Sequence, residues 1–125
     1  MATCLVLALT SSAALAHAPS LADDTHTRCG WFDNPSPSNA TLADHDGEWT
    51  VAVQGGPSAE GAWPKFKLAQ WVRTGVGAAG YGCACLKVRE DPAGGLITHI
   101  VEARANDLSV CQRDDELTVP VNPLK

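Results

Sequence analysis

Charged residues are absent from the first 22 positions of the chain, where no Asp, Glu, Lys or Arg occurs. Instead, an apolar run over residues 5–9 leads into small residues that end at Ala16 and again at Ala22. Such a run is too short for a membrane span, and small residues behind it are typical of a cleaved secretory signal. We therefore expect a signal peptide over residues 1–22, cut after Ala22 or alternatively after Ala16, and a single disulfide-linked domain over residues 23–125.

The sequence also lacks a basic segment. Its nine Lys and Arg residues are scattered, and 14 Asp and Glu residues leave a formal net charge of −5. Proteins that bind nucleic acid or anionic membranes carry basic patches, often with interleaved aromatic residues. We therefore expect no nucleic-acid partner, and no stable membrane span once the signal peptide is removed.

Motifs that mark common catalytic sites are missing as well. The sequence has no Gly-x-Ser-x-Gly elbow, no His-x-His or His-Glu-x-x-His spacing and no glycine-rich phosphate loop. Asp44 or Asp46, acting with His99, would be the residues of a small glycan hydrolase. An Asp-x-Asp-Gly segment is, however, also typical of a tight turn. We therefore predict no catalytic residue, no metal site and no cofactor, and favour a protein that is not an enzyme.

Cysteine is scarce, but its number is even once Cys4 leaves with the signal peptide. The four that remain are Cys29, Cys83, Cys85 and Cys111. In a small exported domain they predict two disulfides, each contributing about 2–4 kcal/mol, with three possible connectivities. A zinc site would need paired Cys-x2–4-Cys motifs, which are absent. The place of Cys83 at the open end of a hairpin favours Cys83–Cys111 with Cys29–Cys85.

Alternation of apolar and polar residues predicts two β-hairpins. The first covers residues 41–54 and turns at residues 44–47, where an Asp-Gly pair suits a tight turn. The second covers residues 81–103 and turns at residues 91–95. Residues 63–72 are the one candidate for a short helix. The expected fold class is α+β and mostly β, a small antiparallel sheet of two hairpins with at most one short helix and two disulfides.

Aromatic residues are few, with four Trp, two Phe and one Tyr. Tryptophan in a small domain usually fills the core, but aromatic side chains beside glycine-rich loops also form exposed binding surfaces. Trp31, Trp63, Trp71 and Tyr81 are therefore the candidate binding residues. The expected partner is a protein or a cell-envelope glycan.

Six motifs follow one another in the order Arg28-Cys29-Gly30-Trp31-Phe32, Asp46-Gly47-Glu48-Trp49, Gln54-Gly55-Gly56, Gly61-Ala62-Trp63-Pro64, Gln70-Trp71-Val72 and Tyr81-Gly82-Cys83-Ala84-Cys85-Leu86. Over residues 28–117 the chain thereby resembles a bacterial exported family, domain of unknown function 4087. It departs from the family pattern at Thr41 and in the loop of residues 75–80. The resemblance implies export and the cysteine framework, and it implies no activity.

These observations predict a small bacterial protein of the periplasm or the exterior, stabilised by disulfides. The favoured function is a non-catalytic binding or inhibitor-type module. Two alternatives remain open, a small cell-envelope hydrolase acting on glycan or peptidoglycan, and a structural envelope protein.

Overall fold

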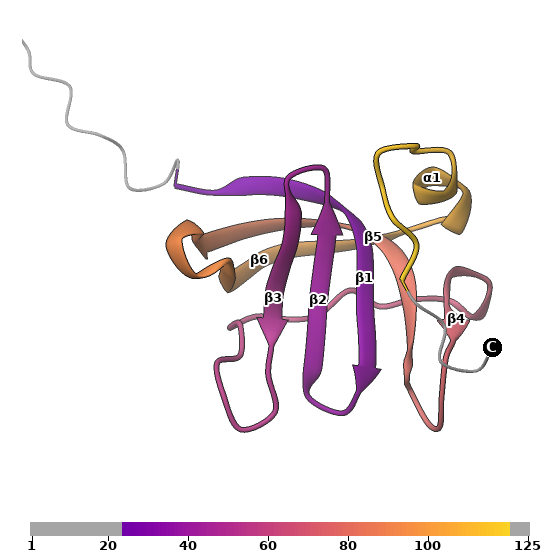
Figure 1. Ribbon diagram of the computed structural model, residues 1–125, viewed down its shortest axis with the longest axis horizontal. Helices are drawn as coiled ribbons and strands as arrows, with labels where there is room; N and C mark the ends of the chain where they lie inside the picture. Colours follow the sequence, from indigo (N-terminus) through magenta and orange to yellow (C-terminus); the bar gives the residue numbers. More distant parts are fainter. Residues whose placement is uncertain (1–23, 121–125) are drawn as a thin grey trace, which may run out of the picture.

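The computed structural model describes residues 24–120, so that the expected signal peptide lies outside the described residues. They form a six-stranded mixed sheet with short helical segments (Figure 1). The strands are β1 (His26–Ser36), β2 (Asn39–Asp44), β3 (Gly47–Ala52), β4 (Val72–Arg73), β5 (Gly80–Asp91) and β6 (Leu96–Asn106). The helical segments are the 3-10 turns η2 (Leu68–Gln70) and η3 (Pro92–Gly94) and the α-helix α1 (Leu108–Gln112).

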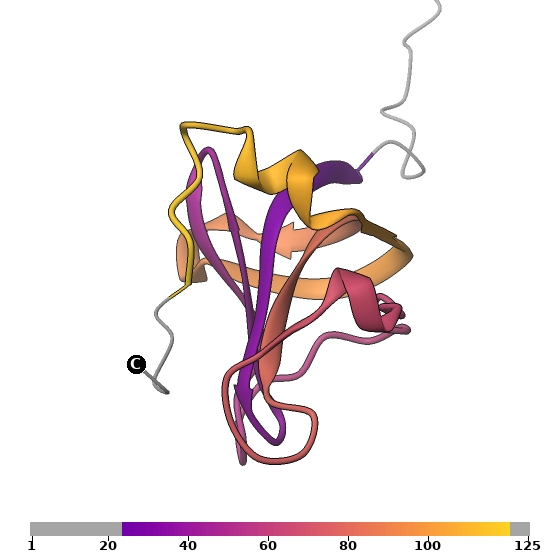
Figure 2. The same cartoon turned by 90° about the vertical axis from the view of Figure 1, so that its right-hand side faces the viewer.

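The sheet curls until it closes on itself, because the long strand β1 pairs with both β2 and β5. Around the resulting barrel the order is β1-β2-β3-β6-β5 and back to β1. β3 and β6 run parallel and pair at Thr50 and Leu96. Next to this contact, the backbone oxygen of Glu60 accepts a hydrogen bond from the Ile100 amide at 2.7 Å. This is the strand order of the partly open OB-type barrel, a likeness that carries no function with it. Figure 2 shows the barrel from the side, with α1 over one end.

The expectation of two antiparallel hairpins is confirmed, but the expectation of a purely antiparallel sheet made of those hairpins alone is wrong. β2–β3 and β5–β6 are the two expected hairpins, both antiparallel, and β1–β2 forms a third. The parallel contact of β3 with β6 makes the sheet mixed. Closure depends on Gly30, where a Cβ atom would overlap the carbonyl oxygen of Ala43 on the neighbouring strand. The expected helix over residues 63–72 is reduced to the turn η2, because the aromatic side chains of this segment pack irregularly against the barrel and not along one helical face.

Two hydrophobic clusters lie on opposite faces of the sheet. Adjacent side chains of a strand point to opposite faces, so Phe32 enters the barrel while Trp31 faces outward. The inner cluster includes Leu86 and Val88, both fully buried and on one face as the alternation predicts. The outer cluster consists of Trp31, Tyr81, Cys83 and Cys111, packed with side chains from α1 and the segment behind it.

Two disulfides fasten the outer face of the barrel. Cys29–Cys85 joins residues that lie directly opposite each other on β1 and β5. Cys83–Cys111 ties α1 to β5. This is the pairing that the sequence favoured. The Cys-x-Cys strand therefore holds both the first strand and the last helix of the domain.

Candidate functional site

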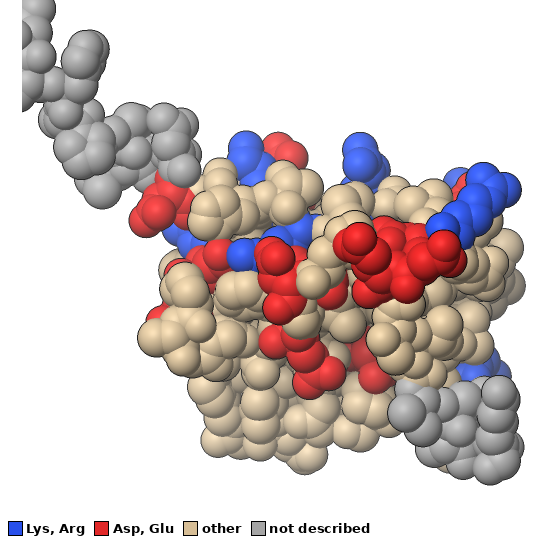
Figure 3. Space-filling view, turned by 45° about the horizontal axis from the view of Figure 1, so that its top comes forward, with Lys and Arg blue, Asp and Glu red and all other residues tan. Residues whose placement is uncertain are grey.

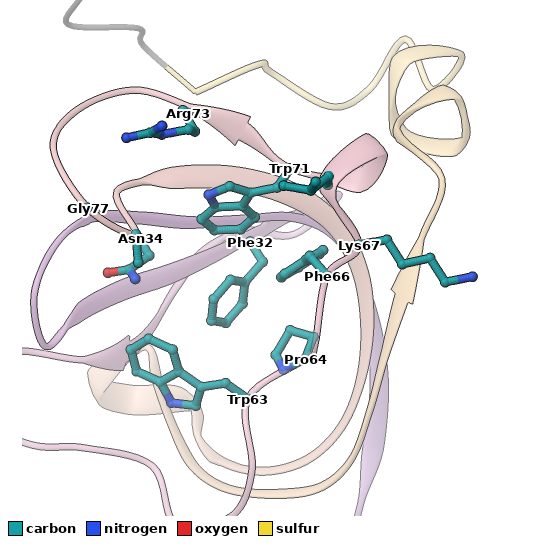
Figure 4. A pocket seen from close by; sticks show the side chains of 11 residues that line it. Phe32, Asn34, Trp63, Pro64, Phe66, Lys67, Trp71, Arg73 and Gly77 are labelled. Carbon is teal, nitrogen blue, oxygen red and sulfur yellow. The ribbon is translucent and has the colours of Figure 1, made fainter.

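An open cleft of about 550 Å³ lies at one mouth of the barrel (Figure 4). It lies between the later half of β1 and residues 63–78, which belong to the long connection from β3 to β5. The lining residues are Phe32, Asn34, Trp63, Pro64, Phe66, Lys67, Leu68, Trp71, Arg73, Gly77 and Ala78. Its size falls within the range of small-ligand sites, which often occur at barrel mouths.

Four aromatic rings form the apolar part of this cleft. Phe32 is 1% exposed and lies at its base, with the ring centre of Trp63 5.5 Å away and that of Phe66 6.0 Å away. Trp71 packs against Phe66 at 4.7 Å. In Figure 4 the indoles of Trp63 and Trp71 lie on either side of Phe32. Both indoles are only half-buried, so part of each ring faces solvent within the cleft.

The glycine-led start of β5 makes room for these rings. A Cβ atom at Gly82 would come 2.6 Å from Cε1 of Phe66 and 2.7 Å from the backbone oxygen of Gln70. At Gly80 a Cβ atom would overlap the Trp71 indole. Side chains two residues apart share a strand face. The two glycines therefore form a flat seat on which the aromatic connection rests.

The polar groups of the cleft are cationic or neutral. Lys67 and Arg73 are exposed, Asn34 is half-buried, and no carboxylate belongs to the lining within residues 24–120. Figure 4 shows Arg73 and Asn34 at the rim, whereas the Lys67 ammonium points away from the rings. In a chain of net charge −5, a carboxylate-free aromatic cleft is locally distinct and favours an apolar or anionic ligand.

A second cluster of polar side chains surrounds Arg28. Its guanidinium donates to Glu90 at 2.5 and 2.8 Å, and through Nη1 to Asp44 at 2.8 Å and Asp46 at 2.9 Å. It also lies 3.9 Å from the ring centre of Trp49. The hydrogen bond from Arg28 lowers the pKa of the Glu90 carboxyl below its ordinary value. Because Arg28 pairs with all three carboxylates, the cluster is a clamp that joins separate parts of the sheet.

Acidic side chains continue from this cluster along the same face (Figure 3). His45 links the β2–β3 turn to the segment behind α1 through Asp114 at 2.6 Å and Glu116 at 3.0 Å. The hydrogen bond to Asp114 raises the pKa of the His45 imidazole. The strongly acidic face and the aromatic cleft have no lining residue in common.

The family model for "Protein of unknown function (DUF4087)" matches residues 23–118. The chain belongs to the DUF4087 family. No curated protein and no solved structure is significantly similar to it. The match covers the cleft, the Arg28 cluster and both disulfides, and it confirms the resemblance carried by the six sequence motifs.

In this DUF4087 chain His99 does not share a site with the two carboxylates of the hydrolase alternative. Asp44 and Asp46 are bound by Arg28 on the acidic face. His99 pairs with Glu60 at 3.1 Å and lines neither the acidic pocket nor the aromatic cleft. Asp33, whose carboxyl pKa is raised by burial and by Glu48, lies in a separate groove. Asp44 and Asp46 lie together on Arg28, and His99 is not placed beside them, so the combination of Asp44 or Asp46 with His99 is not formed.

Of the four aromatic residues proposed for binding, the structure places two in the cleft. Trp63 and Trp71 line the cleft. Trp31 and Tyr81 pack edge to face at 5.3 Å in the outer cluster and are 1% and 9% exposed. The sequence reasoning missed Phe66 as a cleft residue. The sequence pattern that could have indicated the position of Phe66 is the Gly-x-Gly spacing at residues 80–82, because two glycines on one strand face leave room for a large side chain.

Across residues 24–120 no group of three or more His, Cys, Asp or Glu side chains is arranged to hold a metal ion. Within the same residues, no helix has the length and apolar character needed to cross a membrane.

Proposed function

We propose that this DUF4087 protein is an exported, disulfide-stabilised binding module without catalytic activity, and that its ligand binds in the aromatic cleft. The observation that carries the proposal is the pair of half-exposed indoles of Trp63 and Trp71 on either side of an open apolar cleft. Small domains gain stability by burying such rings. A concave site that leaves them accessible is typical of ligand recognition.

Export is supported by three observations. Two disulfides suit an oxidising compartment such as the periplasm or the exterior. Residues 1–22 have the uncharged, apolar composition of a secretory signal. The family match begins at residue 23, directly behind the favoured cleavage site.

Mass spectrometry of the protein isolated from expressing bacterial cells tests the export proposal. We expect a mature N-terminus at Asp23 and a location outside the cytoplasm, with His17 as the N-terminus if the signal is cut after Ala16. Recovery of chains that retain Met1 in the cytoplasm would contradict export.

Binding in the cleft is tested with envelope fractions and matched variants. The oxidised protein is mixed separately with purified peptidoglycan, by co-sedimentation, and with periplasmic proteins, by cross-linking. The cleft variant Trp63→Ala is compared with Val119→Ala, which removes a half-exposed apolar side chain outside the cleft. We expect about tenfold weaker capture for the cleft variant and unchanged capture for the control.

Two results would contradict the binding module. Capture that is equal for both variants would place any ligand outside the cleft. Release of soluble fragments from peptidoglycan by the wild-type protein would favour the hydrolase alternative. Circular dichroism of each variant shows whether the fold is retained.

A further inference from the structure

We infer that the occupant of the cleft is a segment of a partner protein, in which an apolar side chain stands next to a carboxylate. This inference rests on the proposed binding function and names the ligand of the same site. The apolar side chain would enter between Trp63 and Trp71, and the carboxylate would meet Arg73 at the rim.

Two fully exposed aliphatic side chains favour a protein over a glycan. Leu68 lines the cleft and Val76 precedes the lining residue Gly77, and each is 97% exposed. They extend the apolar surface beyond the cleft itself. Protein interfaces are rich in Trp, Phe and Arg at their centres and have apolar cores. A sugar would instead place hydroxyl groups against Leu68 and Val76, where no side-chain hydrogen bond is offered.

Charge complementarity indicates an acidic partner segment. Arg73 and Lys67 are the charged residues of the lining within residues 24–120, and both are cationic. Three acidic residues, Asp44, Asp46 and Asp114, lie instead in the pocket beside Arg28 and His45. An arginine fork pairs with a carboxylate through two parallel hydrogen bonds. A basic segment would gain nothing at this rim.

The cleft is pre-organised to receive such a segment. The Thr74 amide donates to the Ala79 oxygen at 3.0 Å, and the Gln70 side chain donates to Asp107 at 3.3 Å. The glycine seat of β5 holds Phe66 and Trp71 from below. Because the connection is already ordered, binding loses little conformational entropy.

A phage-displayed library of random twelve-residue peptides tests the inference. It is selected on the oxidised, immobilised protein, and the peptide that is most enriched is then titrated by isothermal calorimetry. We expect enriched peptides to share an aromatic or large aliphatic residue beside Asp or Glu. Leu68→Ser and Arg73→Glu should each weaken binding by about tenfold. Neither side chain supports the fold, because both are exposed.

Matched controls use residues outside the cleft. Val119→Ser and Arg113→Glu change an exposed aliphatic and an exposed cationic residue that do not line it. Both should leave the affinity unchanged. Enrichment of basic peptides, or equal effects of cleft and control variants, would overturn the inference.

A parallel titration with chitotetraose separates this inference from the proposed function. Tryptophan fluorescence that responds to the sugar, and is lost in Trp63→Ala, would retain a binding cleft and overturn the protein partner. If neither peptides nor sugar bind, both the inference and the binding module are contradicted.

Discussion

At the scale of single residues, Arg28 is the side chain of its cluster that contacts the largest number of separate segments of the barrel. It connects the start of β1 to the end of β5 through Glu90, and to the β2–β3 turn through Asp44 and Asp46. The side chains of Arg28, Glu90 and Asp44 are 12%, 6% and 7% exposed. Charges withdrawn from water to this degree need their partners, because an unpaired one is strongly unfavourable.

Replacing Arg28 by methionine should therefore destabilise the domain. The variant retains a long apolar stem over Trp49, leaves Asp44 without its cation and leaves Glu90 only its contact with His26 at 2.7 Å among the described residues. We expect the free energy of unfolding to fall by about 3 kcal/mol, as for other broken buried pairs. Urea unfolding with the disulfides intact measures it. Arg104→Met, at an exposed site, is the control and should change stability by less than about 0.5 kcal/mol; equal losses would contradict the clamp.

The two disulfides differ in burial, and this predicts the order of their reduction. Cys83 and Cys111 are 1% and 3% exposed, whereas Cys29 is exposed and Cys85 is half-buried. Lys87 lines the same groove as Cys85, and its positive charge favours the approach of a reductant's thiolate to this disulfide. Limiting reductant followed by alkylation and mass spectrometry should label Cys29 and Cys85 first. Simultaneous labelling of all four cysteines would show that burial does not protect the second bridge.

At the scale of elements, the strand β5 and the connection before it act together. The connection has little regular secondary structure of its own, because η2 is three residues long. Its position is set by the packing of Phe66 and Trp71 on the glycine seat. The cleft is thus a property of the contact between these two elements.

Gly82→Ala should disturb this contact specifically. The added methyl group would lie 2.7 Å from the Gln70 backbone oxygen, so the connection must move. We expect a loss of about 1–3 kcal/mol in unfolding free energy and greater quenching of tryptophan fluorescence by acrylamide. Gly94→Ala is the control, because its added atom makes only ordinary contacts of 3.4 Å. Unchanged quenching in Gly82→Ala would show that the seat does not position the indoles.

The elements also show how far the sequence could predict the structure. The two hairpins follow from local alternation and turn residues, and so could be predicted. The closure of the barrel could not, because β1 pairs not only with its neighbour β2 but also with β5, which is distant in sequence, and closure depends on the close approach at Gly30. Trp63 and Trp71 could be identified as candidates from their glycine-rich surroundings. Their separation from Trp31 and Tyr81 depends on which sheet face each residue occupies after closure.

At the scale of the whole molecule, charge is divided between two regions. The acidic face carries the Arg28 cluster and the His45 link, while the cleft rim is cationic. The acidic face fastens the ends of the barrel strands by ion pairs, so its contribution to stability depends on pH. The aromatic cleft depends on packing and has no carboxylate in its lining within the described chain.

Glu90 makes this dependence measurable. Arg28 lowers the folded-state pKa of its carboxyl below the ordinary value of 4.5. The stabilisation is therefore complete above that value and is lost as the pH falls through the folded-state pKa. The stability difference between wild type and Glu90→Gln, from urea unfolding, should be largest near about pH 6 and shrink below about pH 4. Glu102→Gln, at an exposed site without an ion pair among the described residues, should show a small difference at every pH. Asp33, whose carboxyl pKa is raised, changes the stability in the opposite direction with pH, but it is present in all three proteins and so cancels from the differences. A Glu90→Gln difference that stays constant into acid would contradict the role of the ion pair.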